Sequence, residues 1–324
     1  MKAGDHDGPL AWRIGPEQAG LRLDQAVTTL LDGPSRARIQ QWIDAGRVRV
    51  DGAPQAPRFR LKAGQTVELD LPEPTPVIAD APETIALDPL YEDADLLVVN
   101  KPVGLVVHPG AGNRAGTLVN ALLHFDPALA ALPRAGIVHR LDKDTSGLLV
   151  IARNATAHAR LTAALKDRLI RREYLALVRG PVVAGATIDA PLGRHPRDRL
   201  RQAVVPEGTG REAVTHYRLA ERFRAHTLLE VRLETGRTHQ IRVHLAHVGL
   251  PIVGDRVYGG RVQVPAGASA ALRDALVGFR RQALHAWRLS LRHPGDGREV
   301  DFEAPLPADI AGLLGLLRTD RADL

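Results

Sequence analysis

The sequence contains no cysteine. Disulfide bonds, zinc sites with thiolate ligands, iron–sulfur clusters and cysteine nucleophiles are therefore excluded. Long apolar runs are also missing, because stretches such as 148–152 fall far short of the roughly 18 residues that a membrane span needs. Residues 1–12 are polar and lack the apolar core of a secretory signal. We expect a cytoplasmic protein with no membrane-embedded part.

Lysine is scarce, since 5 of the 43 basic residues are lysine and 38 are arginine. The formal net charge of +6 therefore comes mostly from guanidinium groups, which form bidentate contacts with phosphate. This favours a polyanionic partner, although a GC-rich coding genome would also enrich arginine. Hydrophobic residues make up 44% of the 324 positions, which excludes wholesale disorder and leaves enough chain for two domains.

Proline marks the expected domain boundary. Four prolines fall within 71–82, where they remove backbone donors and disfavour regular structure. We therefore expect a linker here; the alternative is a surface loop inside one domain. The full division is a flexible leader at 1–15, a small domain at 16–71, the linker at 72–84, a large domain at 85–310, and a C-terminal helix and tail at 311–324.

The pattern of the small domain is typical of two helices followed by strands. Ser35 stands where the N-cap of the second helix is expected, and Gly46 where a left-handed residue would end it. The expected elements are helices over 23–30 and 36–45, a hairpin turning at Asp51-Gly52, and a strand over 66–71.

In the large domain, short apolar runs alternate with turn signals. Strands outnumber helices, and the regular alternation of a doubly wound fold is missing. We therefore expect an α+β fold with a mixed, largely antiparallel sheet. The expected strands cover 96–99, 105–107, 147–152, 174–178 and 228–233, and the expected helices cover about 117–124, 155–168 and 239–248.

Two motifs carry weak signals for ligand binding. The glycines in 110–116 follow a strand and precede a helix, but their spacing misses the dinucleotide fingerprint, which favours a plain loop over a phosphate site. His239, His244 and His247 cluster in one helix. Their spacing does not place all three on one helical face, so packing or RNA contacts are favoured over a metal site.

The segment 136–153 is denser in charge than a structural element needs to be. Asp142 lies among cationic and acidic neighbours between two apolar stretches, a setting that can hold a carboxylate rigidly. A cation beside it would keep the carboxylate ionised, as a nucleophile or base requires. The alternative is a surface turn with solvated ion pairs.

A second polar cluster, at 233–244, follows a strand. Arg237 stands at the junction with a helix, Thr238 is the expected N-cap, and Arg242 lies one turn further on. Such a cluster can deliver a cation to a buried carboxylate or to phosphates. The alternative is a basic helix face.

Taken together, these motifs resemble RNA pseudouridine synthases of the RluA type. The resemblance rests on HRLDKDTSG around Asp142, REYLALVRG around Tyr174, LETGRTHQIRVHLAH around Arg237, and IVGDRVYGG. NKPVGLVVHPG and QALHAWRLSLRHP also fit, and the match covers about 85–310. The segment 21–52 is similar to an S4 RNA-binding module. RHPRDR, REAVTHYR and PAGASAAL make the D-type enzymes of the large ribosomal subunit the most similar group.

The resemblance implies a role for each matched residue. Asp142 corresponds to the catalytic aspartate, and Arg140 to the arginine that fills the gap left by the flipped uridine. Tyr174 corresponds to the aromatic residue that stacks on uracil, and Arg237 to the basic residue that pairs with the aspartate. Leu284 corresponds to a wall of the pocket. No cofactor and no metal are expected.

The reaction implied by this resemblance breaks the N1–C1′ bond, rotates the uracil and joins C5 to C1′. The base must leave the helical stack for this to happen. Asp142 could attack C1′, attack the uracil ring, or take a proton from C2′; the sequence does not choose among these. Each route needs an ionised carboxylate, which Arg237 would favour.

The implied substrate is 23S rRNA, in a stem-loop at the subunit interface, or a pre-50S particle, and we expect a monomer. The alternatives are a non-catalytic assembly factor that binds RNA and a synthase that acts on tRNA. Residues expected to contact RNA are Arg36, Arg38, Arg47 and Arg49 in the small domain, and Lys101, Lys143, His239 and Arg242 in the large domain.

Overall fold

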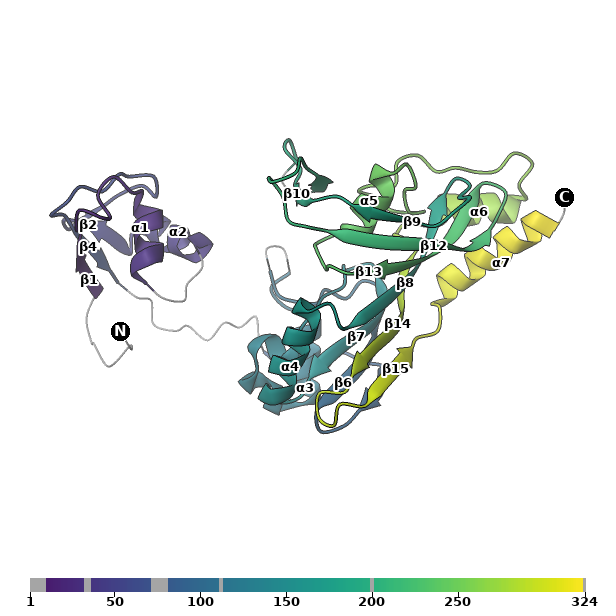
Figure 1. Cartoon of the computed structure of the whole chain (residues 1–324), viewed down its shortest axis with the longest axis horizontal. Helices are drawn as coiled ribbons and strands as arrows, with labels where there is room; N and C mark the ends of the chain where they lie inside the picture. Colours follow the sequence, from purple (N-terminus) through teal and green to yellow (C-terminus); the bar gives the residue numbers. More distant parts are fainter. Residues whose placement is uncertain (1–9, 32–35, 71–80, 111–112, 199–200, 323–324) are drawn as a thin grey trace. The chain divides into compact units, whose positions relative to one another are not determined.

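The computed structural model describes residues 10–31, 36–70, 81–110, 113–198 and 201–322 (Figure 1). The chain divides into an N-terminal unit, Met1–Val77, and a C-terminal unit, Ile78–Leu324. Within the described residues, no helix is both long enough and apolar enough to cross a membrane.

The N-terminal unit packs two helices on a four-stranded antiparallel sheet with the order β1-β4-β2-β3. Apolar residues at helical spacing, among them Leu23, Val27 and Ile39, are fully buried between helices and sheet. Its elements are β1 (Leu10–Arg13), α1 (Leu23–Leu30), α2 (Arg36–Asp44), β2 (Val48–Val50), β3 (Ala53–Pro54) and β4 (Thr66–Leu69).

The turns expected in this unit are confirmed. Gly46 has a positive φ of 71° directly after α2, as a left-handed stop requires. Asp51 and Gly52 both have positive φ, which is the geometry of a tight two-residue hairpin between β2 and β3. The side chain of Asp51 also accepts a hydrogen bond from the backbone N–H of Thr66 (2.8 Å), which fixes the hairpin against β4.

The expected boundaries need correction. The leader at 1–15 is wrong from residue 10 onward, because Leu10–Arg13 forms β1 and pairs with β4. Residues 71–80 and Ser35 lie outside the described residues. The last part of the expected linker, 81–84, belongs to the C-terminal unit, since Asn120 Nδ2 donates to the Ala81 carbonyl (2.8 Å).

The C-terminal unit is built on a nine-stranded sheet with the order β5-β6-β7-β14-β8-β13-β12-β9, and β15 pairs with β14. Every pairing is antiparallel except that of β7 with β14, so the expected α+β fold with a mixed, largely antiparallel sheet is confirmed. The strands are β5 (Pro89–Glu92), β6 (Leu96–Lys101), β7 (Ser146–Ala152), β8 (Arg171–Arg179), β9 (Ala186–Asp189), β12 (Val214–Arg222), β13 (His226–Leu233), β14 (Leu284–Arg292) and β15 (Glu299–Glu303), with β10 (Leu192–Arg194) and β11 (Gln202–Val204) as a separate pair.

Three helices lie where the apolar periodicity predicted them: α3 (Leu118–Phe125), α4 (Ala155–Lys166) and α5 (Gln240–His247). The expected C-terminal helix is α7 (Ala308–Ala322), which begins earlier than expected, and α6 (Ala270–Gly278) was not predicted. The last helix is more than a tail, because Ile310, Leu313, Leu314 and Leu317 are buried in the main core. The strand expected at 105–107 is wrong: this stretch forms a single isolated bridge, between Val106 and Thr117.

The strands β7 and β14 meet at an unusually close approach. Gly147 has a φ of +110°, and a Cβ at this position would lie 2.1 Å from the Ala286 carbonyl oxygen. Glycine is therefore required where the two parallel strands come together. All seven residues of β7 are buried, which explains its continuous apolar sequence.

Candidate active site

Asp142 lies in the loop 138–145, which leads into the buried strand β7. The loop is fixed from three directions. Leu141 is buried in the main core, the backbone N–H of Thr145 donates to the Asp142 carbonyl (3.1 Å), and Gln282 Nε2 donates to Thr145 Oγ1 (3.1 Å). The Asp142 side chain keeps 17% of its surface exposed, so it is held rigidly yet open to a ligand.

Arg242 on α5 joins two carboxylates. Its Nη1 donates to Asp142 Oδ2 (2.9 Å), while Nε and Nη2 donate to the two oxygens of Asp255 (2.7 and 3.0 Å). The Asp255 side chain is fully buried, and that of Arg242 is 7% exposed. Asp142 Oδ2 is occupied by this contact, and Asp142 Oδ1 faces His239 Nε2 at 4.0 Å.

The surroundings of Asp255 and Arg242 favour the charged form of both side chains. Burial opposes ionisation of Asp255, but hydrogen bonds from Arg242 and from two backbone N–H groups hold its pKa below the ordinary value. Burial likewise disfavours the charged form of Arg242, and the two carboxylates overcome it, so the pKa of Arg242 is raised. The guanidinium of Arg242 thus lies between the carboxylates of Asp142 and Asp255.

The expectation that Arg237 pairs with Asp142 is wrong. Arg237 Nε donates to the Glu212 carbonyl (3.0 Å), and its backbone N–H donates to Gln240 Oε1 (3.0 Å). Arg237 precedes α5, whereas Arg242 lies inside the helix, on the face turned toward Asp142. For the same reason Arg242 is no direct RNA contact, since it is buried and occupied by carboxylates.

The start of α5 also differs from the sequence prediction. His239, not Thr238, is the N-cap residue, and it adopts a left-handed conformation with a φ of 59°. Its Nδ1 lies 2.9 Å from the Tyr258 hydroxyl. Burial lowers the pKa of His239, which the negative charge of Asp142 partly opposes. His239 therefore stands beside the carboxylate as a neutral group at neutral pH.

Tyr174 lies on β8, opposite Val231 of β13 and Ala286 of β14. The residue is 5% exposed. Burial raises the pKa of its hydroxyl, the charge of Asp142 raises it further, and that of Arg172 lowers it. The phenol therefore lies within electrostatic reach of both. Leu284, the expected pocket wall, is 3% exposed at the start of β14 and packs in the same core.

Arg172 was not among the site residues expected from the sequence. It precedes Tyr174 by two positions on β8, so both side chains face the same side of the sheet. Arg172 is 7% exposed, its Nε has no hydrogen-bond partner, and Nη2 has a long contact (3.3 Å) to the Glu234 carbonyl. A Cβ on Gly236 would lie 2.7 Å from Nη1, so glycine makes room for the guanidinium. The alternation of side chains along β8 could have identified it.

The expectation that Lys101 contacts RNA is wrong, because the residue is 1% exposed. Its Nζ donates to the carbonyls of Pro102 (2.8 Å), Leu105 (2.9 Å) and Lys143 (3.0 Å). Burial lowers its pKa to about 7, which the nearby carboxylates of Asp142 and Asp144 oppose. Lys101 therefore ties the stretch after β6 to the loop that carries Asp142.

The other expected RNA contacts are distributed over both units. Arg140 and Lys143 are exposed on either side of Asp142. In the N-terminal unit, Arg49 is exposed on β2, and Arg47 lies 3.7 Å from Asp70. The side chains of Arg36 and Arg38 lie outside the described residues.

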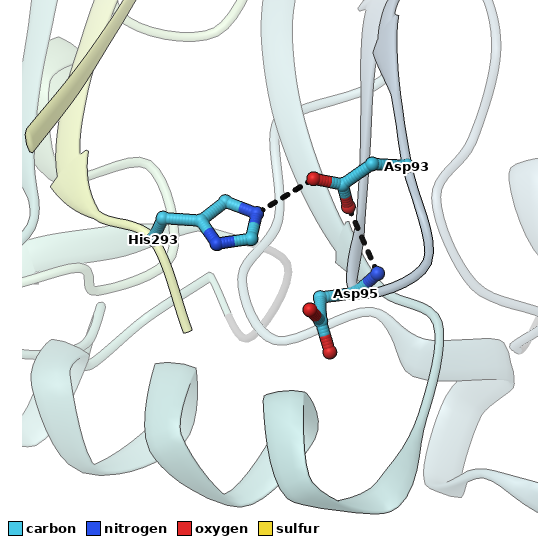
Figure 2. A group of neighbouring side chains, drawn as sticks. All are labelled: Asp93, Asp95 and His293. Atoms are coloured by element: carbon cyan, nitrogen blue, oxygen red, sulfur yellow. Dashed lines mark hydrogen bonds and ion pairs between the residues drawn. The ribbon is translucent and has the colours of Figure 1, made fainter. Parts of the chain in front are cut away.

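Three potential metal ligands meet at the end of β14, far from α5 in the sequence (Figure 2). His293 Nε2 donates to Asp93 Oδ2 (2.8 Å), and the other Asp93 oxygen accepts from the backbone N–H of Asp95 (2.8 Å). Asp95 in turn accepts from Asn154 Nδ2 (2.7 Å), and His293 Nδ1 accepts from the backbone N–H of Gly295 (3.2 Å). With these groups already paired, the cluster fits a hydrogen-bonded junction between strands rather than a metal centre.

Comparisons with known proteins agree on one family. Residues 95–247 match the family model described as RNA pseudouridylate synthase, and residues 21–67 match the S4 domain model. Ribosomal large subunit pseudouridine synthase D of Xanthomonas campestris is 53% identical over 98% of this chain and 95% of its own. The protein of that name from Escherichia coli K12 is 50% identical over 95% of this chain and 94% of its own. Among solved structures, human RNA pseudouridylate synthase domain containing 4 is 26% identical, with a TM-score of 0.55, over 71% of this chain and 93% of its own.

Proposed function

The chain belongs to the RNA pseudouridylate synthase family, and we propose that it converts specific uridines of large-subunit ribosomal RNA to pseudouridine. The single observation that supports a working catalytic centre best is the placement of Asp142 against Arg242 and Asp255. A degenerate RNA-binding relative would not need to keep a buried cation between two carboxylates beside an open loop.

In the proposed mechanism, the target uridine leaves its stack and its uracil lies against Tyr174. Unstacking costs a few kcal/mol, and stacking on an aromatic side chain offsets about 1–3 kcal/mol of that. Arg140, exposed two residues before Asp142, fills the gap in the RNA. The protruding base is thereby brought to the carboxylate.

Arg242 positions Asp142 through Oδ2, which leaves Oδ1 to act on the nucleoside. Oδ1 can attack C1′, attack the ring, or accept the C2′ proton, and all three routes need the ionised form that a neighbouring cation favours. Breaking N1–C1′, turning the uracil and joining C5 to C1′ then requires loss of the C5 hydrogen.

We propose that the N-terminal unit and the exposed cations around Asp142 bind the RNA. Arg47 and Arg49 lie on or beside β2, where they can reach phosphates. We infer that the tether between the two units adds affinity by raising the effective concentration of the catalytic unit at the RNA. The substrate is 23S rRNA or a pre-50S particle, the site of action is the cytoplasm, and the enzyme acts as a monomer.

The decisive experiment measures tritium release from rRNA labelled with 5-³H-uridine, because joining C5 to the sugar expels the C5 hydrogen. We expect release by the wild-type protein, with EDTA present, and none by Asp142→Asn, which should still bind RNA. If the wild type releases tritium from tRNA alone, the proposed substrate is wrong. If Asp142→Asn turns over normally, the assignment of Asp142 is wrong.

A further inference from the structure

The C-terminal unit contains a cavity of about 140 Å³ that the mechanism above does not use. Its walls come from the end of β8, the start of β13, the residues 252–263, and α6 with the residues that follow it. The described loop 138–145 contributes no wall residue. Asp255 connects the two sites, because it lines the cavity and also binds Arg242.

The residues that line this cavity carry more positive than negative charge. Asp255, the one acid among the lining residues, already accepts two hydrogen bonds from Arg242 and one each from the backbone N–H groups of Val257 and Tyr258. In the part of the chain that the structure describes, none of the lining arginines forms an ion pair with a carboxylate. These arginines are Arg179, Arg256, Arg261 and Arg280.

His226 adds a buried polar group to the same wall. The residue is 0% exposed, and neither ring nitrogen has a partner at good hydrogen-bond geometry, although the Gln263 backbone lies near. Burial, together with the charge of Arg179, lowers its pKa to about 4 against the opposing charge of Asp320, so the ring is neutral at neutral pH. A neutral imidazole offers one donor and one acceptor. Buried polar groups are usually satisfied, so a small shift of the ring toward the cavity would let a polar ligand supply the missing hydrogen bond.

The remaining wall is apolar and partly open. Ile252, Leu276 and Phe279 line the cavity. Val262 and Val277, also lining residues, are 49% and 44% exposed, which is unusual for valine side chains beside a core. The volume is close to that of a cavity of about 150 Å³ that holds one benzene molecule. A single six-membered ring therefore fits, and a larger fused two-ring base fits less well.

We propose that this cavity binds an unstacked pyrimidine nucleotide, with its ring against the apolar wall and its phosphate on the arginines. The proposal rests on the proposed function in one respect: a nucleotide of the substrate RNA, next to the modified stem-loop, is the expected source. Free pyrimidine nucleotide has the same chemistry and is the other source.

The first test is a titration of the full-length protein with uridine 5′-monophosphate, followed by NMR or calorimetry. We expect Arg280→Ala and, as a second variant, His226→Asn to weaken binding at least about fivefold, as the loss of a charged or buried contact does. Arg273→Ala, which removes an exposed arginine of α6 outside the cavity, is the control and should bind like the wild type. Adenosine 5′-monophosphate should bind more weakly than the uridine nucleotide.

The titration also identifies binding at the wrong place. If Tyr174→Leu abolishes nucleotide binding while Arg280→Ala leaves it unchanged, the nucleotide occupies the candidate active site and the proposal fails. It also fails if inorganic phosphate binds as tightly as the nucleotide, because the apolar wall then contributes nothing.

The second test separates the two sources. If the occupant is part of the RNA, Arg280→Ala should weaken RNA binding and reduce the salt dependence by about one unit, while single-turnover rates at saturating RNA stay unchanged. If nucleotide binding responds to Arg280→Ala but RNA affinity does not, free nucleotide is the occupant. If the wild type releases no tritium, the proposed function is wrong. The nucleotide titration would still test whether the cavity binds a pyrimidine nucleotide.

Discussion

Arg242 Nη1 lies 2.9 Å from Asp142 Oδ2, although 100 positions separate the two residues in the chain. The contact joins α5 to the loop before β7 and sets the orientation of the carboxylate. Asp255 occupies the other two donors of the same guanidinium, so the orientation of Asp142 depends on a third, fully buried residue.

Replacement of Arg242 should therefore affect both catalysis and stability. Arg242→Gln leaves the buried carboxylate of Asp255 without its cation, which typically costs about 3–5 kcal/mol. Activity should fall at least about a hundredfold because Asp142 also loses its positioning contact. Urea unfolding and tritium release measure the two effects. Arg237→Gln is the matched control, and an equal loss of activity there would restore Arg237 as the partner of the aspartate.

Tyr174 should be tolerant of phenylalanine and intolerant of leucine. Stacking on uracil needs the ring and not the hydroxyl, so Tyr174→Phe should stay within about tenfold of the wild-type kcat/KM. Tyr174→Leu removes the platform and should lose about 1–3 kcal/mol of stacking, or roughly 5–150-fold. Kinetics on the same RNA distinguish them. A large loss in Tyr174→Phe would instead assign a chemical role to the hydroxyl.

Because of Lys101, the stability of the C-terminal unit should increase as the pH rises above neutral. Its pKa falls from 10.5 to about 7 on folding, so the unfolded chain binds this proton more strongly between these values. Stability contributed by Lys101 therefore increases as the pH rises from about 7 to 10.5. In urea titrations, the unfolding free energy of the wild type minus that of Lys101→Met should become more positive over this range. A constant difference would mean that the ammonium keeps its proton in the folded state.

Gly147→Ala should be strongly destabilising. The new Cβ would lie 2.1 Å from a backbone oxygen of β14 at a φ that alanine rarely adopts, so β7 and β14 must separate. We expect a loss of more than about 3 kcal/mol, as for other severe backbone clashes. Gly312→Ala, in α7 with open space around it, should instead gain about 0.5–1 kcal/mol. Thermal unfolding compares the pair, and equal melting temperatures would contradict the required close approach.

Arg49→Ala should weaken RNA binding without slowing the chemical step. The side chain is exposed on β2, so its removal leaves the fold intact. Loss of one phosphate contact should reduce the salt slope by about one and raise KM more than it lowers kcat. Arg292→Ala, exposed in the C-terminal unit beside Glu299, serves as the control. An unchanged salt slope in Arg49→Ala would remove β2 from the RNA contact surface.

Much of the architecture could be predicted because apolar periodicity reports local structure directly. The helices over α3, α4 and α5 and the strands β7, β8 and β13 follow their patterns closely. The edge strand β1 was missed since four residues of a leader carry too little periodicity, and its partner β4 lies more than 50 positions away. The false strand at 105–107 is apolar because it packs on α3 and the main core, not because it joins the sheet.

The candidate site shows a different limit. The density of charged residues in the sequence located Asp142. The sequence alone does not decide whether Arg237 or Arg242 is its partner. The direction of each side chain is decided by where α5 begins, and the left-handed His239 moves that point by one residue. Lys101 was wrongly expected to contact RNA because a lysine in a turn usually reaches solvent. Here hydrogen bonds to three carbonyls hold its ammonium group inside.

The place of β14 within the sheet has a consequence for synthesis of the protein on the ribosome. This strand lies between β7 and β8 in space, yet it follows both of them, and β13 as well, in the chain (Figure 1). While the chain is being made, the N-terminal unit can fold as soon as it emerges, but the two halves of the large sheet stay unjoined until β14 has been made. Premature termination before β14 should therefore leave a chain with a folded N-terminal unit and an incomplete catalytic unit.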